Sequence, residues 1–267
     1  MKKSLILLLT SVFIFASCSN GNNSSDNVVT YIGTKSPTVA KEVGDIVFND
    51  GSAMPYTEFT GLDVATKDEK KTAAIALIFY KGTGLNSGTD TTTSRTLGVG
   101  LKHDKNGRAW CLDSANAYSI IITTIQCFAS GSGDKDGSNN LEQIEAFAGV
   151  DDTSTAANYP AFYFAKNYST TATNLGTAYA SGWYLPSIAE LFQIYACRAD
   201  STNGFDIDNV SEALGGDKFE DSLYWSSSQY NVSAKGAYEL SFNNGVLGSS
   251  RNKGSSYGSV CAIRAFN

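Results

Sequence analysis

The sequence has few of the residues on which metal sites and proton-transfer catalysis most often depend. It contains a single histidine, His103, among 267 residues. Histidine is the commonest metal ligand and the one side chain whose ordinary pKa lies near neutral pH. One copy argues against histidine-based chemistry, and we expect no catalytic residue, no metal site and no cofactor.

Positive charge and long apolar runs are also scarce. The formal net charge is −6 at pH 7, with 20 basic and 26 acidic side chains. Such a chain repels phosphate backbones and anionic membrane faces, so we expect no nucleic-acid partner. Beyond residue 17 no apolar run is long enough to cross a bilayer.

The first residues have the pattern of an export signal. A basic start, Met1–Lys3, precedes the apolar run Ser4–Phe15, and two small residues then lead to Cys18. This run is too short for a spanning helix, so residues 1–17 are expected to be a signal peptide. Small residues before a cysteine resemble a lipobox. We therefore expect lipidation at Cys18 and anchoring to the outer membrane at the cell surface; ordinary secretion is the alternative.

The segment after Cys18 is polar, and Ser19–Asn27 contains no apolar side chain. It cannot bury enough surface to offset its ordering entropy, so residues 18–43 are expected to be a flexible tether. Residues 44–267 then form one domain. Four cysteines remain there, and the sequence leaves both buried thiols and disulfides open: Cys111, Cys127, Cys197 and Cys261.

Ser187 and Glu190 predict the start of a helix most clearly. A serine followed three residues later by a glutamate forms a capping box. The apolar side chains that follow are spaced for one helical face: Ile188, Leu191, Phe192 and Tyr195. Further helices are expected at 141–148 (capped by Asn140), 159–168 and 210–214.

Strands are expected on both sides of these helices. Apolar runs and turn residues predict strands within 43–52, 72–80, 95–101 and 108–112, and at 119–125 unless 114–126 is a helix. Near the C-terminus Tyr238, Leu240 and Phe242 alternate with polar residues, and Asn244-Gly245 predicts a hairpin turn. A closing strand is expected over 260–266. Strands, helices and strands in this order predict an α+β fold.

The segment from Tyr224 to Gly258 has the composition of a binding surface. It contains nine serines, five glycines, four asparagines and four tyrosines. Antibody loops use the same residues for rigid contact area and adaptable hydrogen bonds. We expect these residues to bind a protein or glycan ligand: Tyr230, Asn231, Val232, Ser233, Glu239, Ser241, Asn243, Asn244, Val246, Ser249, Ser250, Arg251, Asn252, Ser255, Ser256 and Tyr257.

Three motifs in the C-terminal third resemble a known fold. Gly182–Leu191, Tyr224–Ser228 and Val260–Phe266 are similar to motifs of the C-type lectin-like fold, in the branch of the formylglycine-generating enzymes. The resemblance implies an α+β domain with mixed antiparallel sheets and two main helices. It also implies that Trp183 and Trp225 pack in the core.

Together with the lipobox, these motifs resemble target proteins of diversity-generating retroelements, and among them a variable lipoprotein of spirochaetes. In that family adenine-directed mutagenesis rewrites codons near the 3′ end of the gene, and the fold displays the altered side chains. The resemblance implies a surface receptor that binds diverse ligands without covalent chemistry. Rewriting the first two bases of an Asn codon cannot give Gln229, Lys235, Glu239 or Lys253. These four residues would be constant or would arise from other codons.

Two other function classes remain as alternatives. One is an invariant structural or adhesive surface lipoprotein. The other is an enzyme of the sulfatase-modifying type, but the related oxidases need paired cysteines and Cys261 stands alone in its segment. Asp134–Gly137 resembles a calcium loop without the glycine and glutamate spacing of an EF-hand, so a solvated turn is expected there.

Overall fold

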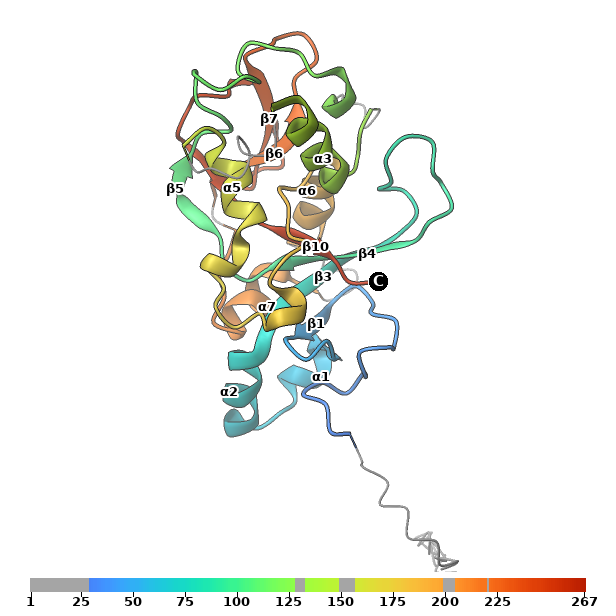
Figure 1. Ribbon diagram of the computed structural model, residues 1–267. Helices are drawn as coiled ribbons and strands as arrows, with labels where there is room; N and C mark the ends of the chain where they lie inside the picture. Colours follow the sequence, from blue (N-terminus) through green and yellow to red (C-terminus); the bar gives the residue numbers. More distant parts are fainter. Residues whose placement is uncertain (1–28, 128–132, 149–156, 199–204, 220) are drawn as a thin grey trace, which may run out of the picture. The chain divides into compact units, whose positions relative to one another are not determined.

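The structure, a computed structural model, describes residues 29–127, 133–148, 157–198, 205–219 and 221–267 (Figure 1). The chain divides into two units, and the unit Tyr31–Asn267 contains all the helices and strands given below. The predicted signal peptide and Cys18 lie outside the described residues. No helix among the described residues is long and apolar enough to cross a membrane.

The start of the folded unit differs from the expected tether boundary at residue 43. Lys35 pairs with Ala53 as an isolated β-bridge, and its ammonium lies 2.6 Å from Asp45. The Gly33 N–H donates to the Ser52 hydroxyl. Residues from Tyr31 onward therefore belong to the folded unit, because backbone pairing offsets the low apolar content of this stretch.

The first sheet has five antiparallel strands in the order β10-β4-β3-β1-β2. Its strands are β1 (Asp45–Phe48), β2 (Ala53–Pro55), β3 (Ala74–Gly82), β4 (Arg95–Gly100) and β10 (Ile263–Ala265). Both faces of β3 are buried, as its continuous apolar run predicts: Leu77 and Phe79 join one core cluster, whereas Ile75 and Ile78 join another.

The second sheet also has five strands, in the order β5-β9-β6-β7-β8. They are β5 (Asp104–Arg108), β6 (Leu223–Gln229), β7 (Gly236–Ser241), β8 (Leu247–Asn252) and β9 (Gly258–Val260). The β6–β9 pair is parallel and the other pairs are antiparallel, so the sheet is mixed. In Figure 1 β6 and β7 lie at the upper end of the folded unit, opposite α1 and α2.

The described residues include six α-helices. They are α1 (Tyr56–Thr60), α2 (Val64–Ala73), α3 (Gly137–Ala148), α5 (Pro160–Lys166), α6 (Ile188–Ala196) and α7 (Ile207–Ala213). The capping box at α6 is confirmed, with the Ser187 hydroxyl accepting from Glu190 N–H at 3.2 Å and the Glu190 carboxylate accepting from Ser187 N–H at 2.7 Å. These elements confirm the α+β class predicted from the sequence.

Several boundaries differ from the predictions. The α3 helix begins at Gly137, and Asp136 accepts from Ser138 N–H at 3.0 Å, so Asn140 lies inside the helix and donates to Ser227 instead of capping it. The strand expected at 108–112 lies at 104–108. The segment 119–125 forms neither a strand nor a long helix, but a 3₁₀ turn at Thr123–Ile125.

The expected closing strand over 260–266 is split between the two sheets. Ser259 of β9 pairs with Tyr224 in the second sheet, while Ile263 of β10 pairs with Val99 in the first. Cys261 and Ala262, fully buried, form the crossing between them. This two-residue crossing connects the two sheets directly.

Candidate binding face

The β7–β8 hairpin is held by the three apolar side chains that the alternation predicts to point inward. Tyr238, Leu240 and Phe242 are at most 2% exposed and belong to one core cluster. Phe242 stacks on Phe219 with ring centroids 4.4 Å apart, and its edge meets Tyr195 of α6 at 5.7 Å. Helix α6 therefore supports the hairpin from the core side through Tyr195.

The expected turn at Asn244-Gly245 is present, and Gly245 has a φ of 69°, which favours glycine. A Cβ at Gly245 would lie 2.6 Å from the Tyr195 ring, so the close approach also excludes larger residues. Trp225 is fully buried, as is Trp183 at 1% exposure, which confirms that both tryptophans pack in the core.

Most of the predicted binding residues lie at the surface. We call the segments 230–233, 243–246 and 249–257, apart from the buried Lys253, the display face. Its most exposed large side chains are Tyr257 at 76%, Val232 at 69% and Val246 at 57%. The exposed predicted residues are Val232, Asn243, Asn244, Val246, Ser249, Ser250, Asn252, Ser256 and Tyr257. The half-buried ones are Tyr230, Asn231, Ser233, Ser241, Arg251 and Ser255.

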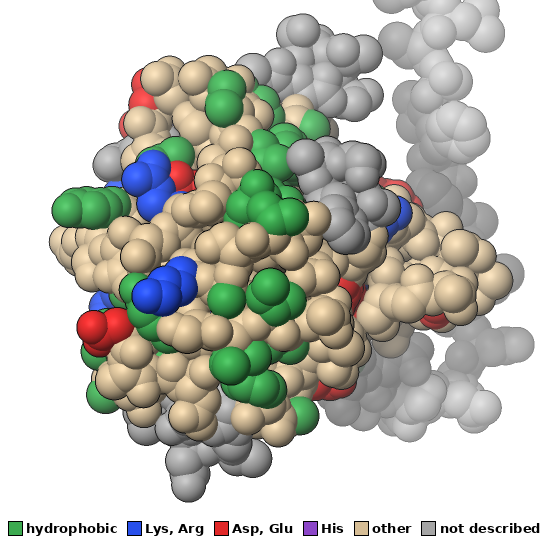
Figure 2. All heavy atoms as spheres, turned by 90° about the horizontal axis from the view of Figure 1, so that it is seen from above, with side chains coloured by type: hydrophobic (Ala, Val, Ile, Leu, Met, Phe, Trp, Pro, Cys, Tyr) green, Lys and Arg blue, Asp and Glu red, His purple; other side chains and the backbone are tan. Residues whose placement is uncertain are grey.

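Figure 2 views the folded unit from above, the end where β6 and β7 lie in Figure 1. Backbone and uncharged polar or glycine residues (tan) cover most of this side, hydrophobic side chains are scattered among them, and few charged side chains are visible. Such a mixture fits contacts made through shape and hydrogen bonds rather than through long-range charge.

Glu239 was expected to point outward, and this prediction is wrong. Its side chain is 2% exposed and accepts a hydrogen bond from Arg251 Nε at 2.8 Å. The polar side of β7 is covered because β8 passes beside it: a Cβ at Gly248 would lie 2.5 Å from Glu239 Cγ. Burial raises the pKa of the Glu239 carboxyl, and Arg251 opposes this rise.

A second segment, 112–126, supports the display face from the side. The Gln229 amide donates to Ile120 O at 2.6 Å, and Gln229 Oε1 accepts from Ile122 N–H at 2.9 Å. Lys253, fully buried, donates to Ala117 O at 2.7 Å and lies 4.7 Å from the Trp110 ring centroid. Burial lowers the pKa of Lys253 to about 8.

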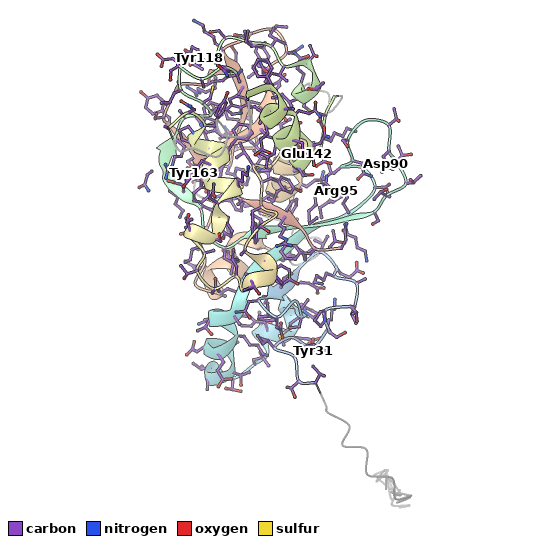
Figure 3. The ribbon with its side chains drawn as sticks, viewed as in Figure 1. Tyr31, Asp90, Arg95, Tyr118, Glu142 and Tyr163 are labelled. Carbon is purple, nitrogen blue, oxygen red and sulfur yellow. The ribbon has the colours of Figure 1, made fainter. Side chains whose placement is uncertain are left out.

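Three surface residues of this second segment were missed in the sequence. Tyr118 donates to Asn252 Oδ1 at 3.2 Å and lies under the Lys235 ammonium. Figure 3 labels Tyr118 at the same upper end of the folded unit. Ile120 and Ile121 are 43% and 41% exposed. Their adjacent apolar side chains predict a strand, and only the absence of a repeating apolar period could have indicated a surface loop.

The backbone of β8 is strained at one predicted binding residue. Ser250 has a φ of 66°, in the left-handed region that costs a non-glycine residue free energy. It lies on the outermost strand of the second sheet, where the β7–β8 register shifts between Ala237 and Glu239. The irregularity turns this edge away from regular pairing, as bulges on natural edge strands do.

Several buried titratable groups elsewhere have structural partners. The solvated turn expected at Asp134–Gly137 is wrong: Asp136 is 8% exposed and lies 3.0 Å from Arg95, which also lies 3.4 Å from Glu190, so this segment closes a buried ion-pair cluster. Burial raises the pKa of Glu190 to about 8, although Arg95 and two backbone N–H groups favour its charged form. Among the described residues no group of three or more His, Cys, Asp or Glu could hold a metal ion.

The cysteines and the histidine are buried in the core. Cys111, Cys127, Cys197 and Cys261 are not joined in disulfides. Burial raises the pKa of the Cys111 thiol to about 12, which makes its reactive thiolate scarce at neutral pH. His103 packs against Phe219 and Tyr224, and burial lowers its pKa to about 4.

The comparisons with known proteins bear on the fold alone. Neither a protein family nor a curated protein matches the sequence. A fimbrial protein from Bacteroides ovatus, solved as a crystal structure, has a similar fold, with a TM-score of 0.58 and 15% sequence identity. The match covers 84% of this chain and 48% of that protein, so the chain spans about half the length of the structure it resembles.

Proposed function

We propose that the protein is a surface-displayed lipoprotein receptor that binds ligands non-covalently through the display face and is not an enzyme. The domain is proposed to be a C-type lectin-like fold, and its segment 225–258 to be diversified by a retroelement. The observation that carries the proposal is the division of this segment into buried scaffold residues, such as Leu240, and exposed polar and aromatic residues, such as Tyr257.

The physical argument concerns the cost of binding. Association must offset the entropy of ordering side chains and loops, and a preorganised backbone lowers this cost. Gln229 and Lys253 tie the display face to the segment 112–126, and the Asn244-Gly245 turn fixes the hairpin backbone. Its exposed side chains can therefore change while the backbone that presents them stays in place.

One specific finding favours a second candidate, an invariant adhesive surface protein. A solved structure with a similar fold is a fimbrial protein, and fimbriae are surface structures. An invariant adhesin would use the same display face for a single ligand. The two candidates share the fold and the face and differ only in whether the face varies between cells.

The gene itself distinguishes these candidates. For a diversified receptor we expect a near-identical template downstream that differs from the 3′ end only at adenines, next to a reverse-transcriptase gene. Deep sequencing of one population should then show changes at codons such as those of Asn231 and Tyr257, and constant codons for Trp225 and Leu240. A constant 3′ end with no template would exclude the variable receptor and leave the adhesin.

The anchor is tested separately. Radiolabelled palmitate should be incorporated by the natural chain and not by Cys18→Ala, and protease added to intact cells should remove the domain. A Cys18→Ala chain that is still labelled, or a domain protected on intact cells, would contradict the proposed location.

A further inference from the structure

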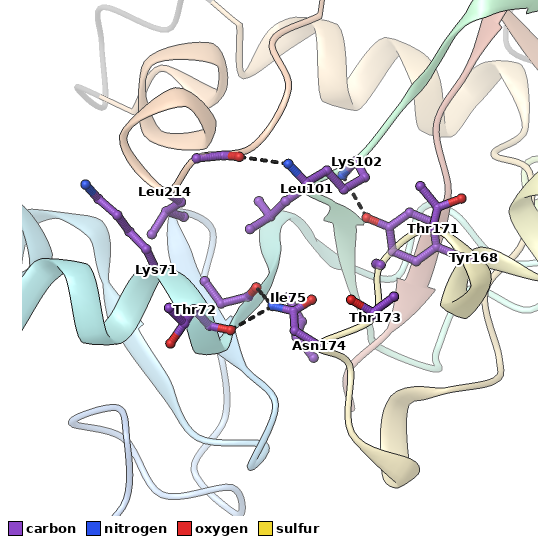
Figure 4. A pocket seen from close by; sticks show the side chains of 13 residues that line it. Lys71, Thr72, Ile75, Leu101, Lys102, Tyr168, Thr171, Thr173, Asn174 and Leu214 are labelled. Atoms are coloured by element: carbon purple, nitrogen blue, oxygen red, sulfur yellow. Dashed lines mark hydrogen bonds between the residues drawn. The ribbon is translucent and has the colours of Figure 1, made fainter.

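A cavity of about 290 Å³ opens between the end of α2, the β4–β5 connection and the end of α7 (Figure 4). Its floor is apolar and buried: Ile75 and Leu101 are 1% and 7% exposed, and Leu214 is 4% exposed. This volume lies at the lower end of the range for ligand pockets, which suits a molecule of monosaccharide size.

The walls of this cavity are fixed by hydrogen bonds. The Asn174 amide donates to Thr72 O at 3.0 Å and to Ala74 O at 2.9 Å, which closes the end of α2. Tyr168, fully buried, accepts from Lys102 N–H at 2.8 Å. The dashed lines in Figure 4 show both sets of bonds, so the cavity does not need a ligand to form.

The rim is cationic and rich in hydroxyl groups. The Lys102 ammonium donates to Gly215 O at 2.8 Å across the opening, which leaves two of its three N–H groups for a ligand. Lys71 lies at the far edge with its ammonium directed outward, and Thr171 and Thr173 line the edge near Tyr168. Among the described residues that line the cavity none is acidic, although the whole chain has a net charge of −6. Lys71 pairs with Asp68 at 3.1 Å, but both side chains are exposed and such a pair contributes little.

We propose that this cavity binds a sugar acid, with the carboxylate at the lysine rim and one face of the ring on the apolar floor. An apolar floor with convergent polar groups is the usual construction of a small-molecule site. Threonine hydroxyls can both donate to and accept from sugar hydroxyls. No residue of the display face lines the cavity, so this site is independent of the proposed receptor function.

The test is a methyl NMR titration of the purified protein with galacturonate, galactose and inorganic phosphate. We expect galacturonate to shift the methyl signals of Ile75, Leu101 and Leu214 at millimolar concentration. Galactose and phosphate should bind at least about tenfold more weakly, since each lacks one of the two binding elements. If galactose binds as tightly as galacturonate, the lysines have no role in binding. If phosphate binds as tightly as galacturonate, the apolar floor has none.

Variants locate the site. Lys71→Met with Lys102→Met should weaken galacturonate binding about tenfold, since each exposed charge contributes about threefold. Thr173→Phe, a change at an exposed rim position, should abolish binding by filling the opening. Lys67→Met is the matched control on α2, because Lys67 does not line the cavity. Unchanged binding in folded Thr173→Phe, or no shift with natural protein, would refute the proposal.

Discussion

Arg251 is a surface arginine whose removal is expected to destabilise the protein. It lies on the display face, and a purely displayed side chain could be changed with little effect on folding. Its Nε, however, donates to Glu239 at 2.8 Å, and Glu239 is 2% exposed. Arg251→Ala therefore leaves a carboxylate buried beside β8 without its cation.

The expected loss follows from the burial of the two partners. Breaking a fully buried ion pair costs about 3–5 kcal/mol because the remaining charge is poorly solvated. The Arg251 side chain is 41% exposed, so water can enter after truncation and solvate part of the carboxylate. We therefore expect Arg251→Ala to lower the free energy of unfolding by about 2 kcal/mol at pH 7.

The assay is urea unfolding at several pH values. Without Arg251 the folded-state pKa of Glu239, already raised by burial, rises further. A carboxyl whose pKa is raised on folding makes its full contribution to the free energy of unfolding below its unfolded pKa. This contribution is lost as the pH rises through the folded-state pKa. The deficit of Arg251→Ala should therefore shrink as the pH falls toward the unfolded pKa of glutamate, about 4.3.

Adding Glu239→Gln should restore part of the stability of Arg251→Ala, because the buried group then carries no charge. Tyr257→Ala, at a residue 76% exposed, is the control and should change stability by less than about 0.5 kcal/mol. If Arg251→Ala and Tyr257→Ala unfold alike, and Glu239→Gln gives no recovery, the ion pair contributes nothing and the reasoning is refuted.

Three further predictions concern stability. Leu240→Ala should lower the free energy of unfolding by about 2–5 kcal/mol, because Leu240 is fully buried; a loss as small as that of Tyr257→Ala would show that β7 is oriented differently. The His103 Hε1 signal should titrate near pH 4 rather than 6.5, and since the pKa falls on folding, stability should decrease as pH is lowered through this range; a midpoint near 6.5 would show that the ring is solvated. Ser250→Gly should raise the melting temperature, because glycine relieves a φ of 66°, with Ser249→Gly as the neighbouring control; equal effects at both would argue against local strain.

Local features of the fold followed from the sequence. The capping box at Ser187 and Glu190, the turn at Asn244-Gly245 and the alternation of Tyr238, Leu240 and Phe242 lie where the sequence predicts them. Each depends on residues at most four positions apart. Periodicity and turn chemistry determine such short-range structure, because the interacting groups are neighbours in the chain.

Features that depend on distant partners were decided by the tertiary structure. The segment 260–266 reads as one strand, yet Val260 pairs with Asp104 in the second sheet and Ile263 pairs with Val99 in the first. Lys253 is buried because Ala117, 136 residues earlier, accepts its hydrogen bond. Glu239 is buried because β8 brings Arg251 and the bare backbone of Gly248 against it.

The composition of the segment 224–258 by itself predicted an exposed polar and aromatic surface, but only ten of its 35 residues are exposed, eleven are half-buried and fourteen are buried. The structure decided which of them are free to vary, because burial depends on what packs against a residue and not on its own type. It also added Tyr118, Ile120 and Ile121 to the same end of the folded unit. Those contacts join parts of the chain that no local pattern connects.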